Sequence, residues 1–349
     1  MRVGMQSERR RAVLNTHLRF SALLIFSLAI LPLGQAEAAG FQGCNAGPTA
    51  KLTVNVRARG AKGNGRADDT AAIQRAINEV AGTGGTVFIP KGTYMVRAER
   101  NGHLKLKSKM TLRMAPGATL KMFPTGVARY AVLKIANAED VNVIGGTLQG
   151  DRLKHKGRGG EWGMGIFIGN AQARRVMISN VRSRHMWGDG FYVGNGEDIA
   201  FCSVLAEKNR RQGLSIVQAN RVLVTGSLFR DTKGTRPAAG IDLEPDKPHQ
   251  KITNVRIERS RFINNEGGGI MIAGKKARIS RVQIQRNEFD GARPLLIEYA
   301  PRVAESHICD NRYKPFRRVD MKVFEKVSRP KHTVGMQRRC NSQARKWLW

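Results

Sequence analysis

The stretch Gly165-Ile166-Phe167-Ile168 decides the fold, because close copies of it return along the chain. The copies are Gly190-Phe191-Tyr192-Val193, Gly213-Leu214-Ser215-Ile216, Gly240-Ile241-Asp242-Leu243, Gly269-Ile270-Met271-Ile272 and Pro294-Leu295-Leu296-Ile297. The interval is about 25 residues, which is typical of a solenoid of stacked units. Apolar and variable residues alternate within each copy, so each copy is predicted to be a short strand.

Two further columns of residues keep the same interval. They are Val176, Ile199, Val222, Val255 and Val282, and then Ser183, Ala206, Phe229, Phe262 and Phe289. Three strands per unit, without the apolar spacing of helical repeats or the ladder of leucine-rich repeats, predict an all-β right-handed parallel β-helix. The residues expected to form one inward ladder are Ile166, Phe191, Leu214, Ile241, Ile270 and Leu295.

The N-terminal part carries a helix with an apolar face, formed by Ile73, Ala76, Ile77 and Val80. Asp69 is its expected N-cap, and Gly82 and Gly84 end it. The segments before and after it are Arg59-Gly60-Ala61-Lys62-Gly63-Asn64-Gly65-Arg66-Ala67-Asp68-Asp69-Thr70 and Gly85-Thr86-Val87-Phe88-Ile89-Pro90-Lys91-Gly92-Thr93-Tyr94. This region resembles the entry segment of the pectate-lyase-like β-helix superfamily, which includes polygalacturonases, polysaccharide lyases and tailspikes. The resemblance implies that the helix caps the open end of the solenoid. It does not indicate one reaction, because many activities share this fold.

The first 38 residues have the pattern of a secretory signal peptide. An arginine-rich start precedes the apolar run from Phe20 to Leu33, and Ala36-Glu37-Ala38 follows. Cleavage after Ala38 and export to the periplasm or medium are expected, with an uncleaved anchor as the alternative. The rest of the chain contains no candidate membrane span. The predicted domains are residues 39–313, a β-helix with its cap at about 57–95, and a basic C-terminal cap or tail at 314–349.

The four cysteines are Cys44, Cys202, Cys309 and Cys340, without C-x-x-C spacing. An exported chain permits disulfides, and the pair Cys309–Cys340 is favoured because both lie near the C-terminal end. Cys202 follows a strand of the repeat and is expected to be free and buried.

The chain carries 60 Lys and Arg against 27 Asp and Glu, a formal net charge of +33. Such a charge favours a polyanionic partner, here an acidic polysaccharide. A lineage that uses much arginine is the alternative explanation. Nucleic acid is not expected, because no nucleic-acid-binding motif accompanies the charge and aromatic residues are sparse.

The repeat is broken around the strand Gly240–Glu244. The loops on either side, residues 230–238 and 245–251, are longer than their equivalents in other units, and long loops around a rigid strand can wall a cleft. Asp242 and Glu244 alternate with inward Ile241 and Leu243, so both should point away from the core. Such a pair suits the acid and base of a glycosidase, whereas a solvated pair or a calcium site are the alternatives.

Asp189 lies just before a strand, on the expected side of this cleft. It resembles the Asp in the Asn-Thr-Asp-Gly segment of polygalacturonases. The paired Asp, the Gly-His-Gly and the Arg-x-Lys of those enzymes are absent, and so is the Asp-Pro-His-Glu of mannuronan epimerases.

The sequence therefore favours an exported glycoside hydrolase that acts on an acidic polysaccharide with Asp242, Glu244 and Asp189 as catalytic residues. The expected substrate contacts are His185, Trp187, Tyr192, Arg211, Gln212, Asp246 and Trp162, although His185, Trp187 and Arg211 also suit ordinary turn or surface roles. A polysaccharide lyase that uses Arg211 and His185 is the second hypothesis, and a non-catalytic glycan-binding or surface protein is the third. No cofactor is expected, unless a lyase uses calcium on the carboxylates.

Overall fold

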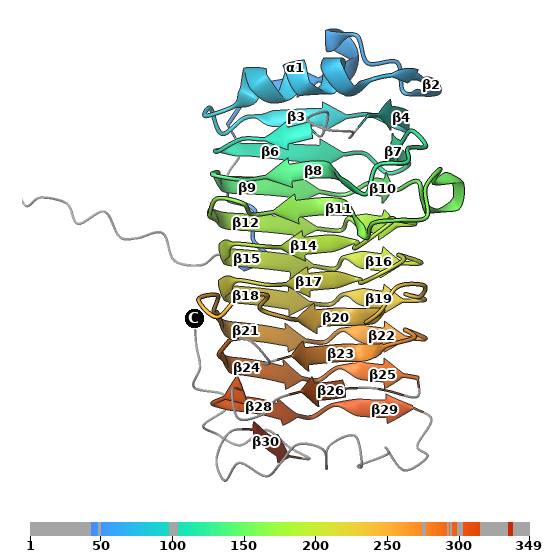
Figure 1. Cartoon of the computed structure of the whole chain (residues 1–349). Helices are drawn as coiled ribbons and strands as arrows, with labels where there is room; N and C mark the ends of the chain where they lie inside the picture. Colours follow the sequence, from blue (N-terminus) through green and yellow to red (C-terminus); the bar gives the residue numbers. More distant parts are fainter. Residues whose placement is uncertain are drawn as a thin grey trace, which may run out of the picture. The chain divides into compact units, whose positions relative to one another are not determined.

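The computed structural model describes residues 43–47, 50–97, 104–273, 277–291, 293, 295–298, 303–314 and 334–337. The predicted signal peptide and most of the basic C-terminal segment lie outside these residues. The described residues belong to one compact unit, in which parallel strands stack coil upon coil (Figure 1). None of the helices in this part of the chain is long and apolar enough to cross a membrane.

Each coil contributes one strand to each of three parallel sheets, which we call sheets A, B and C. Sheet A contains β1 (Thr53–Asn55), β3 (Thr86–Ile89), β6 (Met110–Met114), β9 (Glu139–Ile144), β12 (Ala173–Ser179), β15 (Gly196–Cys202), β18 (Ala219–Thr225), β21 (Ile252–Glu258), β24 (Ile279–Gln285), β27 (Val303–Ala304), β28 (Ser306–Cys309) and β30 (Val334–Gln337). Sheet B contains β2 (Asn64–Asp68), β4 (Gly92–Val96), β7 (Ala118–Met122), β10 (Thr147–Gln149), β13 (Arg182–Arg184), β16 (Leu205–Glu207), β19 (Leu228–Arg230), β22 (Arg261–Ile263), β25 (Glu288–Asp290) and β29 (Arg312–Lys314). Sheet C contains β5 (Leu104–Leu106), β8 (Arg129–Ile135), β11 (Trp162–Ile168), β14 (Phe191–Val193), β17 (Leu214–Ile216), β20 (Ala239–Leu243), β23 (Gly268–Ala273) and β26 (Leu295–Glu298).

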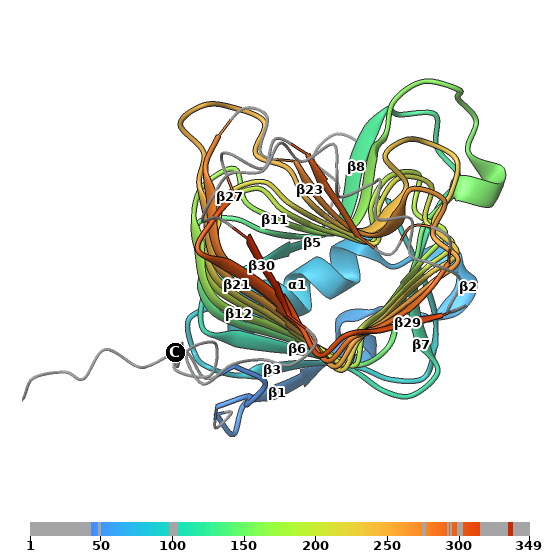
Figure 2. The same cartoon turned by 90° about the horizontal axis from the view of Figure 1, so that it is seen from below.

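The predicted inward ladder is confirmed. The register places its six members opposite one another on consecutive strands of sheet C, and each has at most 1% of its surface exposed: Ile166, Phe191, Leu214, Ile241, Ile270 and Leu295. On sheet B the rings of Phe229, Phe262 and Phe289 stack with centroids 5.4 and 4.9 Å apart. Viewed along the stack, the three sheets enclose this core (Figure 2).

Helix α1 (Thr70–Val80) lies at the end of the stack next to β1 and β3, and its apolar face is buried. Asp69 stands at the N-cap position but does not cap the helix. Its carboxylate instead accepts hydrogen bonds from the backbone N–H of Lys62 and Gly63, at 2.6 and 3.1 Å, and so holds the preceding loop.

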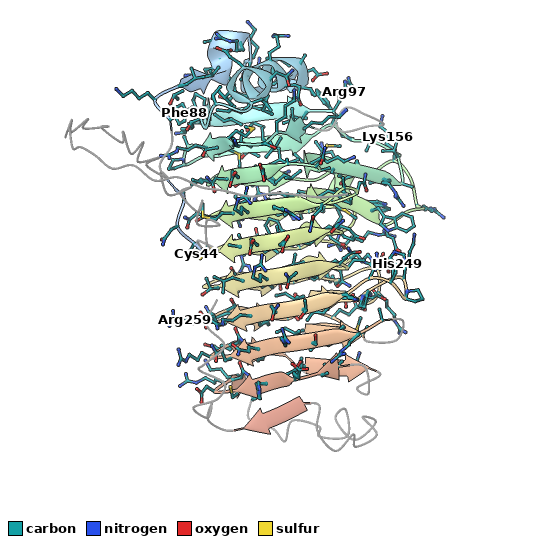
Figure 3. The ribbon with its side chains drawn as sticks, turned by 90° about the vertical axis from the view of Figure 1, so that its left-hand side faces the viewer. Cys44, Phe88, Arg97, Lys156, His249 and Arg259 are labelled. Atoms are coloured by element: carbon teal, nitrogen blue, oxygen red, sulfur yellow. A yellow bond between two sulfur atoms is a disulfide. The ribbon has the colours of Figure 1, made fainter. Side chains whose placement is uncertain are left out.

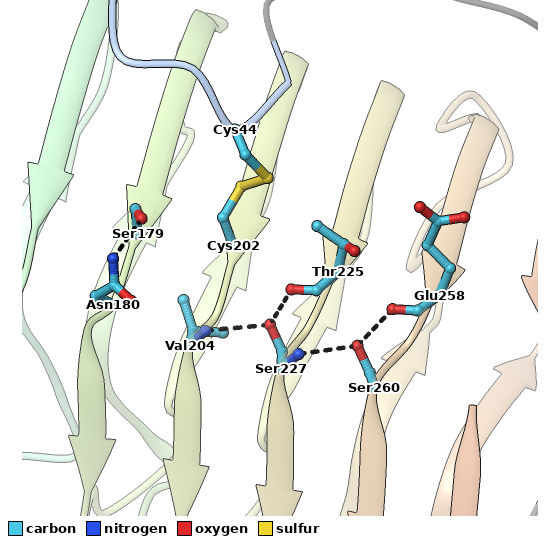
Figure 4. Close-up of a disulfide and its surroundings, with 9 residues drawn as sticks. All are labelled: Cys44, Ser179, Asn180, Cys202, Val204, Thr225, Ser227, Glu258 and Ser260. Atoms are coloured by element: carbon cyan, nitrogen blue, oxygen red, sulfur yellow. Dashed lines mark hydrogen bonds between the residues drawn. A yellow bond between two sulfur atoms is a disulfide. The ribbon is translucent and has the colours of Figure 1, made fainter. Parts of the chain in front are cut away.

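Cys202 is buried as predicted, but the prediction that it is free is wrong, because it forms a disulfide with Cys44 across a sequence separation of 158 residues. The bond fixes the N-terminal segment to the outside of sheet A at the end of β15 (Figures 3 and 4). Alternation along a strand does not reveal that a distant segment returns to its outer face. Cys309 is also disulfide-bonded, and its favoured partner, Cys340, lies outside the described residues.

One outer row of sheet A stacks residues in the left-handed backbone region, with φ between 49° and 58°, and its first four members alternate in charge. Its members are Asp140, Arg175, Asp198, Arg221, Asn254 and Arg281. Nε of Arg175 donates to Oδ1 of Asp140 at 2.6 Å, and Arg221 donates to Asp198. We call this row the charge ladder. Because neighbours in these pairs have opposite charge, part of the arginine content of the chain is paired within the fold.

Candidate active site

Arg211 brings together carboxylates from different coils. It lies in the turn between β16 and β17, and its side chain is only 14% exposed. Its Nη1 is 3.4 Å from Oδ2 of Asp189, its Nη2 is 3.5 Å from Oε2 of Glu244, and its Nε is 3.8 Å from Oε2 of Glu161. Burial acts to lower the pKa of Arg211, but the carboxylates, with Asp242 among them, outweigh burial and raise it. The guanidinium therefore stays charged.

Asp189 is completely buried in the turn that precedes β14. Its Oδ2 accepts a hydrogen bond from the hydroxyl of Ser215 at 2.9 Å, whereas its Oδ1 has no hydrogen-bond partner. Burial raises the pKa of Asp189 to about 6, despite the opposing effects of Arg211 and Ser215. This carboxyl can therefore change its protonation state near neutral pH.

Asp242 is also completely buried, although its outward position on β20 predicts an exposed carboxylate. Alternation assigns a side chain to a face of the sheet but does not report whether that face is covered. Gln212 donates to Oδ2 of Asp242 at 2.7 Å, and the amide oxygen of Gln212 accepts from the backbone N–H of Ala239 at 2.8 Å. These two contacts fix the orientation of the Gln212 amide.

Burial raises the pKa of Asp242 well above its ordinary range, and the nearby carboxylate of Glu244 raises it further. An uncharged Asp242 has a proton to share, and its Oδ1 lacks a hydrogen-bond donor. Glu244, directly after β20, is the neighbouring group that can accept this proton. The two residues thus form a carboxyl–carboxylate pair.

Glu161 belongs to the site but was missed in the sequence, because it lies in a turn that has no periodic pattern. This turn, residues 150–161, is the longest connection from sheet B to sheet C in the described part of the chain. The insertion is visible in the residue numbers, because more residues separate Leu148 from Gly165 than separate Ser183 from Gly190 in the next coil.

Tyr192 lies on the same outer face, on β14, and its ring stacks on Phe167 with centroids 5.3 Å apart. Burial raises the pKa of the Tyr192 hydroxyl, and the carboxylates of Asp246 and Asp189 add to this. Asp246 itself is exposed in the loop after β20. Both residues therefore lie at the margin of the carboxylate cluster.

The contacts of the remaining predicted residues are with groups other than Arg211. Trp162 is 38% exposed, with the guanidinium of Arg129 at 4.7 Å from its ring centroid. Trp187 stacks on His155 at 3.9 Å and lies under Arg210. The backbone of His185 bonds to Glu207 and Arg152, outside the cluster. Burial lowers the pKa of His185, and the charges that act on it are those of Arg184, Lys208, Glu207 and Arg152.

No group of three or more His, Cys, Asp or Glu side chains within the described ranges is arranged to hold a metal ion. At the cluster, a guanidinium already lies between the carboxylates.

Two family models match the sequence. Residues 53–121 match "Rhamnogalacturonase A/epimerase, pectate lyase-like", and residues 164–306 match "Right handed beta helix region". Together they cover the N-terminal coils and the repeats that carry Asp189, Arg211, Asp242 and Glu244, whereas Glu161 lies between the two matched ranges.

Individual proteins are similar over parts of the chain. The uncharacterized protein YclG of Bacillus subtilis (strain 168) is 26% identical over 267 residues, which cover 64% of this chain and 45% of that protein. The mannuronan C5-epimerase AlgE5 of Azotobacter vinelandii is 35% identical over 151 residues, which cover 40% of this chain and 15% of the epimerase. The chain thus spans less than half the length of these relatives. The Family 28 exopolygalacturonase of Yersinia enterocolitica shares the fold, with a TM-score of 0.56 and 14% identity over 77% of this chain and 67% of that one.

Proposed function

We propose that this chain, which belongs to the pectate-lyase-like superfamily of right-handed parallel β-helix proteins, is a glycoside hydrolase that acts on an acidic polysaccharide. The observation that carries the proposal is the pair of the buried Asp242 and the partly exposed Glu244 beside the cation of Arg211. Hydrolysis of a glycosidic bond needs a carboxyl that gives a proton and a carboxylate that accepts one. Asp242 keeps a proton that it can pass to Glu244, which is 38% exposed and can reach a substrate.

The lyase hypothesis receives less support from the same geometry. A lyase needs an uncharged base that removes a proton next to a uronic carboxylate, and a cation that neutralises this carboxylate. Arg211 is held in its charged form by carboxylates that already surround it, and the charges that act on His185 are those of Arg184, Lys208, Glu207 and Arg152 rather than those of the cluster. The two residues on which the lyase hypothesis depends therefore do not form one site.

An acidic polysaccharide is supported by the net charge of +33 and by the partial similarity to a mannuronan C5-epimerase. Export is supported by the disulfide of Cys44 and Cys202, since such bonds persist in oxidising compartments. N-terminal sequencing of secreted or periplasmic protein should give a start near Ala39. An intact Met1 on that protein would contradict cleavage after Ala38.

The test is a screen of purified protein against acidic and neutral polysaccharides, with reducing ends and the absorbance of unsaturated uronates both recorded. New reducing ends without unsaturated product support the hydrolase, and unsaturated product indicates the lyase. Absence of both products indicates a non-catalytic binding protein. On a substrate that is cleaved, Asp242→Asn and Glu244→Gln should each lower kcat at least about 100-fold. The matched control is Asp290→Asn on the outer face of sheet B, which should keep wild-type activity.

A further inference from the structure

The carboxylates around Arg211 differ in whether a substrate can touch them. Asp189 and Asp242 have no exposed surface, whereas the side chains of Glu161 and Glu244 are 33% and 38% exposed. A residue that protonates a glycosidic oxygen or takes a proton from water must come within hydrogen-bond distance of it. The two buried groups can therefore act only through their neighbours.

We propose that Glu161 and Glu244 are the two carboxyl groups that contact the substrate, an inference that rests on the proposed glycosidase function. Both lie against the guanidinium of Arg211, Glu161 at Nε and Glu244 at Nη2. Contact with one guanidinium keeps the two carboxyl groups within about 10 Å of each other, the upper end of the separations found between the catalytic carboxyls of glycosidases. The buried Oδ1 atoms of Asp189 and Asp242 and Nε of Arg211 have no hydrogen-bond partner, as expected where a bound molecule or water completes the site.

The pairing with Asp242 assigns the two roles. Glu244 directly follows β20 and is two residues from Asp242, and burial raises the pKa of Asp242. Asp242 can therefore pass a proton to Glu244, which is the acid, and Glu161 activates water. Glu161 takes a proton from the water while the water oxygen bonds to the anomeric carbon. The proton of Asp242 passes to Glu244, the bond from the anomeric carbon to the glycosidic oxygen breaks, and that oxygen takes this proton from Glu244.

The turn that carries Glu161 is anchored directly before this residue. Nη1 of Arg210 donates to the carbonyl oxygen of Gly160 at 2.7 Å, and Nε1 of Trp187 donates to that of Gly159 at 3.2 Å. Arg210 and Trp187 belong to the next two coils. They are positioning residues, because they fix the backbone of Glu161 against the coils that supply Asp189 and Arg211.

The beginning of the same turn is fixed by Asp151, which is buried. Its carboxylate accepts from the hydroxyl of Tyr130 at 2.7 Å and from the backbone N–H of Thr125 at 3.0 Å, and it contacts Nδ1 of His155 at 2.8 Å. His155 in turn stacks on Trp187 with ring centroids 3.9 Å apart. One connected set of contacts therefore holds both ends of the turn, so the position of Glu161 does not depend on a free loop.

The decisive experiment measures the pH dependence of kcat/KM for Glu161→Gln and Glu244→Gln on a polysaccharide that the wild type hydrolyses. Each variant should lose at least about 100-fold in kcat. Because the base must be deprotonated and the acid protonated, Glu161→Gln should remove the fall of activity at low pH, and Glu244→Gln the fall at high pH. Replacing a residue with a purely structural role would lower activity at every pH, but activity would still fall at both low and high pH.

The matched control is Glu288→Gln on sheet B, which should retain the wild-type rate and pH profile. For the positioning residues, Trp187→Phe keeps an aromatic ring but removes the Nε1–H that donates to Gly159. It should lower kcat about 10- to 100-fold with little change in KM. If the wild type hydrolyses the substrate and Glu161→Gln keeps both its rate and the fall of activity at low and at high pH, the assignment of Glu161 is wrong. The proposed hydrolase function is then unaffected. Absence of reducing ends from the wild type overturns both.

Discussion

Nη1 of Arg211 lies 3.4 Å from the buried Oδ2 of Asp189, a residue of the preceding coil. The contact lowers the pKa of Asp189, but burial has the larger effect and leaves the pKa at about 6. The site therefore contains a charge pair that the fold separates from water. Breaking such a pair leaves a buried charge without a partner, which costs more stability than an exposed pair contributes.

Replacing Arg211 by Met should lower the free energy of unfolding at pH 7 by about 3–5 kcal/mol, because Asp189 loses its cation. The loss should be smaller at pH 5, where Asp189 takes up a proton. Urea unfolding at both pH values measures this. Arg259→Met is the control, since Arg259 is exposed directly after β21 of sheet A, at the left edge of the stack in Figure 3. Equal losses for the two variants at pH 7 would show that the pair is unimportant.

Asp189 should make the protein less stable as pH rises from about 4 to about 6. The folded-state pKa lies above the ordinary value of 3.8, so the folded protein binds more protons than the unfolded chain in this window. Asp189→Asn cannot ionise, and its stability relative to wild type should improve by on the order of 3 kcal/mol between pH 4 and pH 7. Urea unfolding across this range provides the measurement. A difference between variant and wild type that does not change with pH contradicts the raised pKa.

The disulfide of Cys44 and Cys202 should contribute to stability, because it closes a long loop of the unfolded chain. The double variant Cys44→Ser/Cys202→Ser is expected to lose about 2–5 kcal/mol in the free energy of unfolding. Retention of the wild-type denaturation midpoint by this variant would argue against the bond. Mass spectrometry of the wild type after alkylation without reductant should find both cysteines unmodified.

The largest expected loss of stability is at the inward ladder of sheet C. Ile241→Asp places an unpaired charge among fully buried neighbours and should prevent folding. Ile241→Val keeps the apolar character of the position and should cost only about 1 kcal/mol. Circular dichroism of both proteins distinguishes the two outcomes, and a folded Ile241→Asp protein contradicts the ladder.

The fold could be predicted from the sequence because each coil repeats the same apolar positions. Ile166 and Phe191 obey the same alternation, and parallel stacking then places one above the other. The site could be predicted only in part. Asp189, Arg211, Asp242 and Glu244 lie in the repeat and could be aligned by counting, and the structure brings them together.

Properties that depend on what covers a strand were beyond the sequence. The partner of Cys202 and the contact of Glu161 with Arg211 come from segments outside the local repeat, and the burial of Asp242 depends on side chains of other coils such as Gln212. His185 shows the opposite case. It is close to Asp189 in sequence, but its backbone has a φ of 52°, and the charges that act on it lie away from the cluster.

The charge ladder of sheet A has a consequence for how the solenoid can change its length. Asp140, Arg175, Asp198 and Arg221 alternate in sign from coil to coil. Deleting the single coil that carries Arg175 would set Asp140 directly against Asp198, whereas deleting two consecutive coils would keep opposite charges adjacent. Duplicating a single internal coil would likewise set two like charges against each other, whereas duplicating two consecutive coils would not. Variants of this protein shortened or lengthened by an even number of coils should therefore be better tolerated than those changed by one.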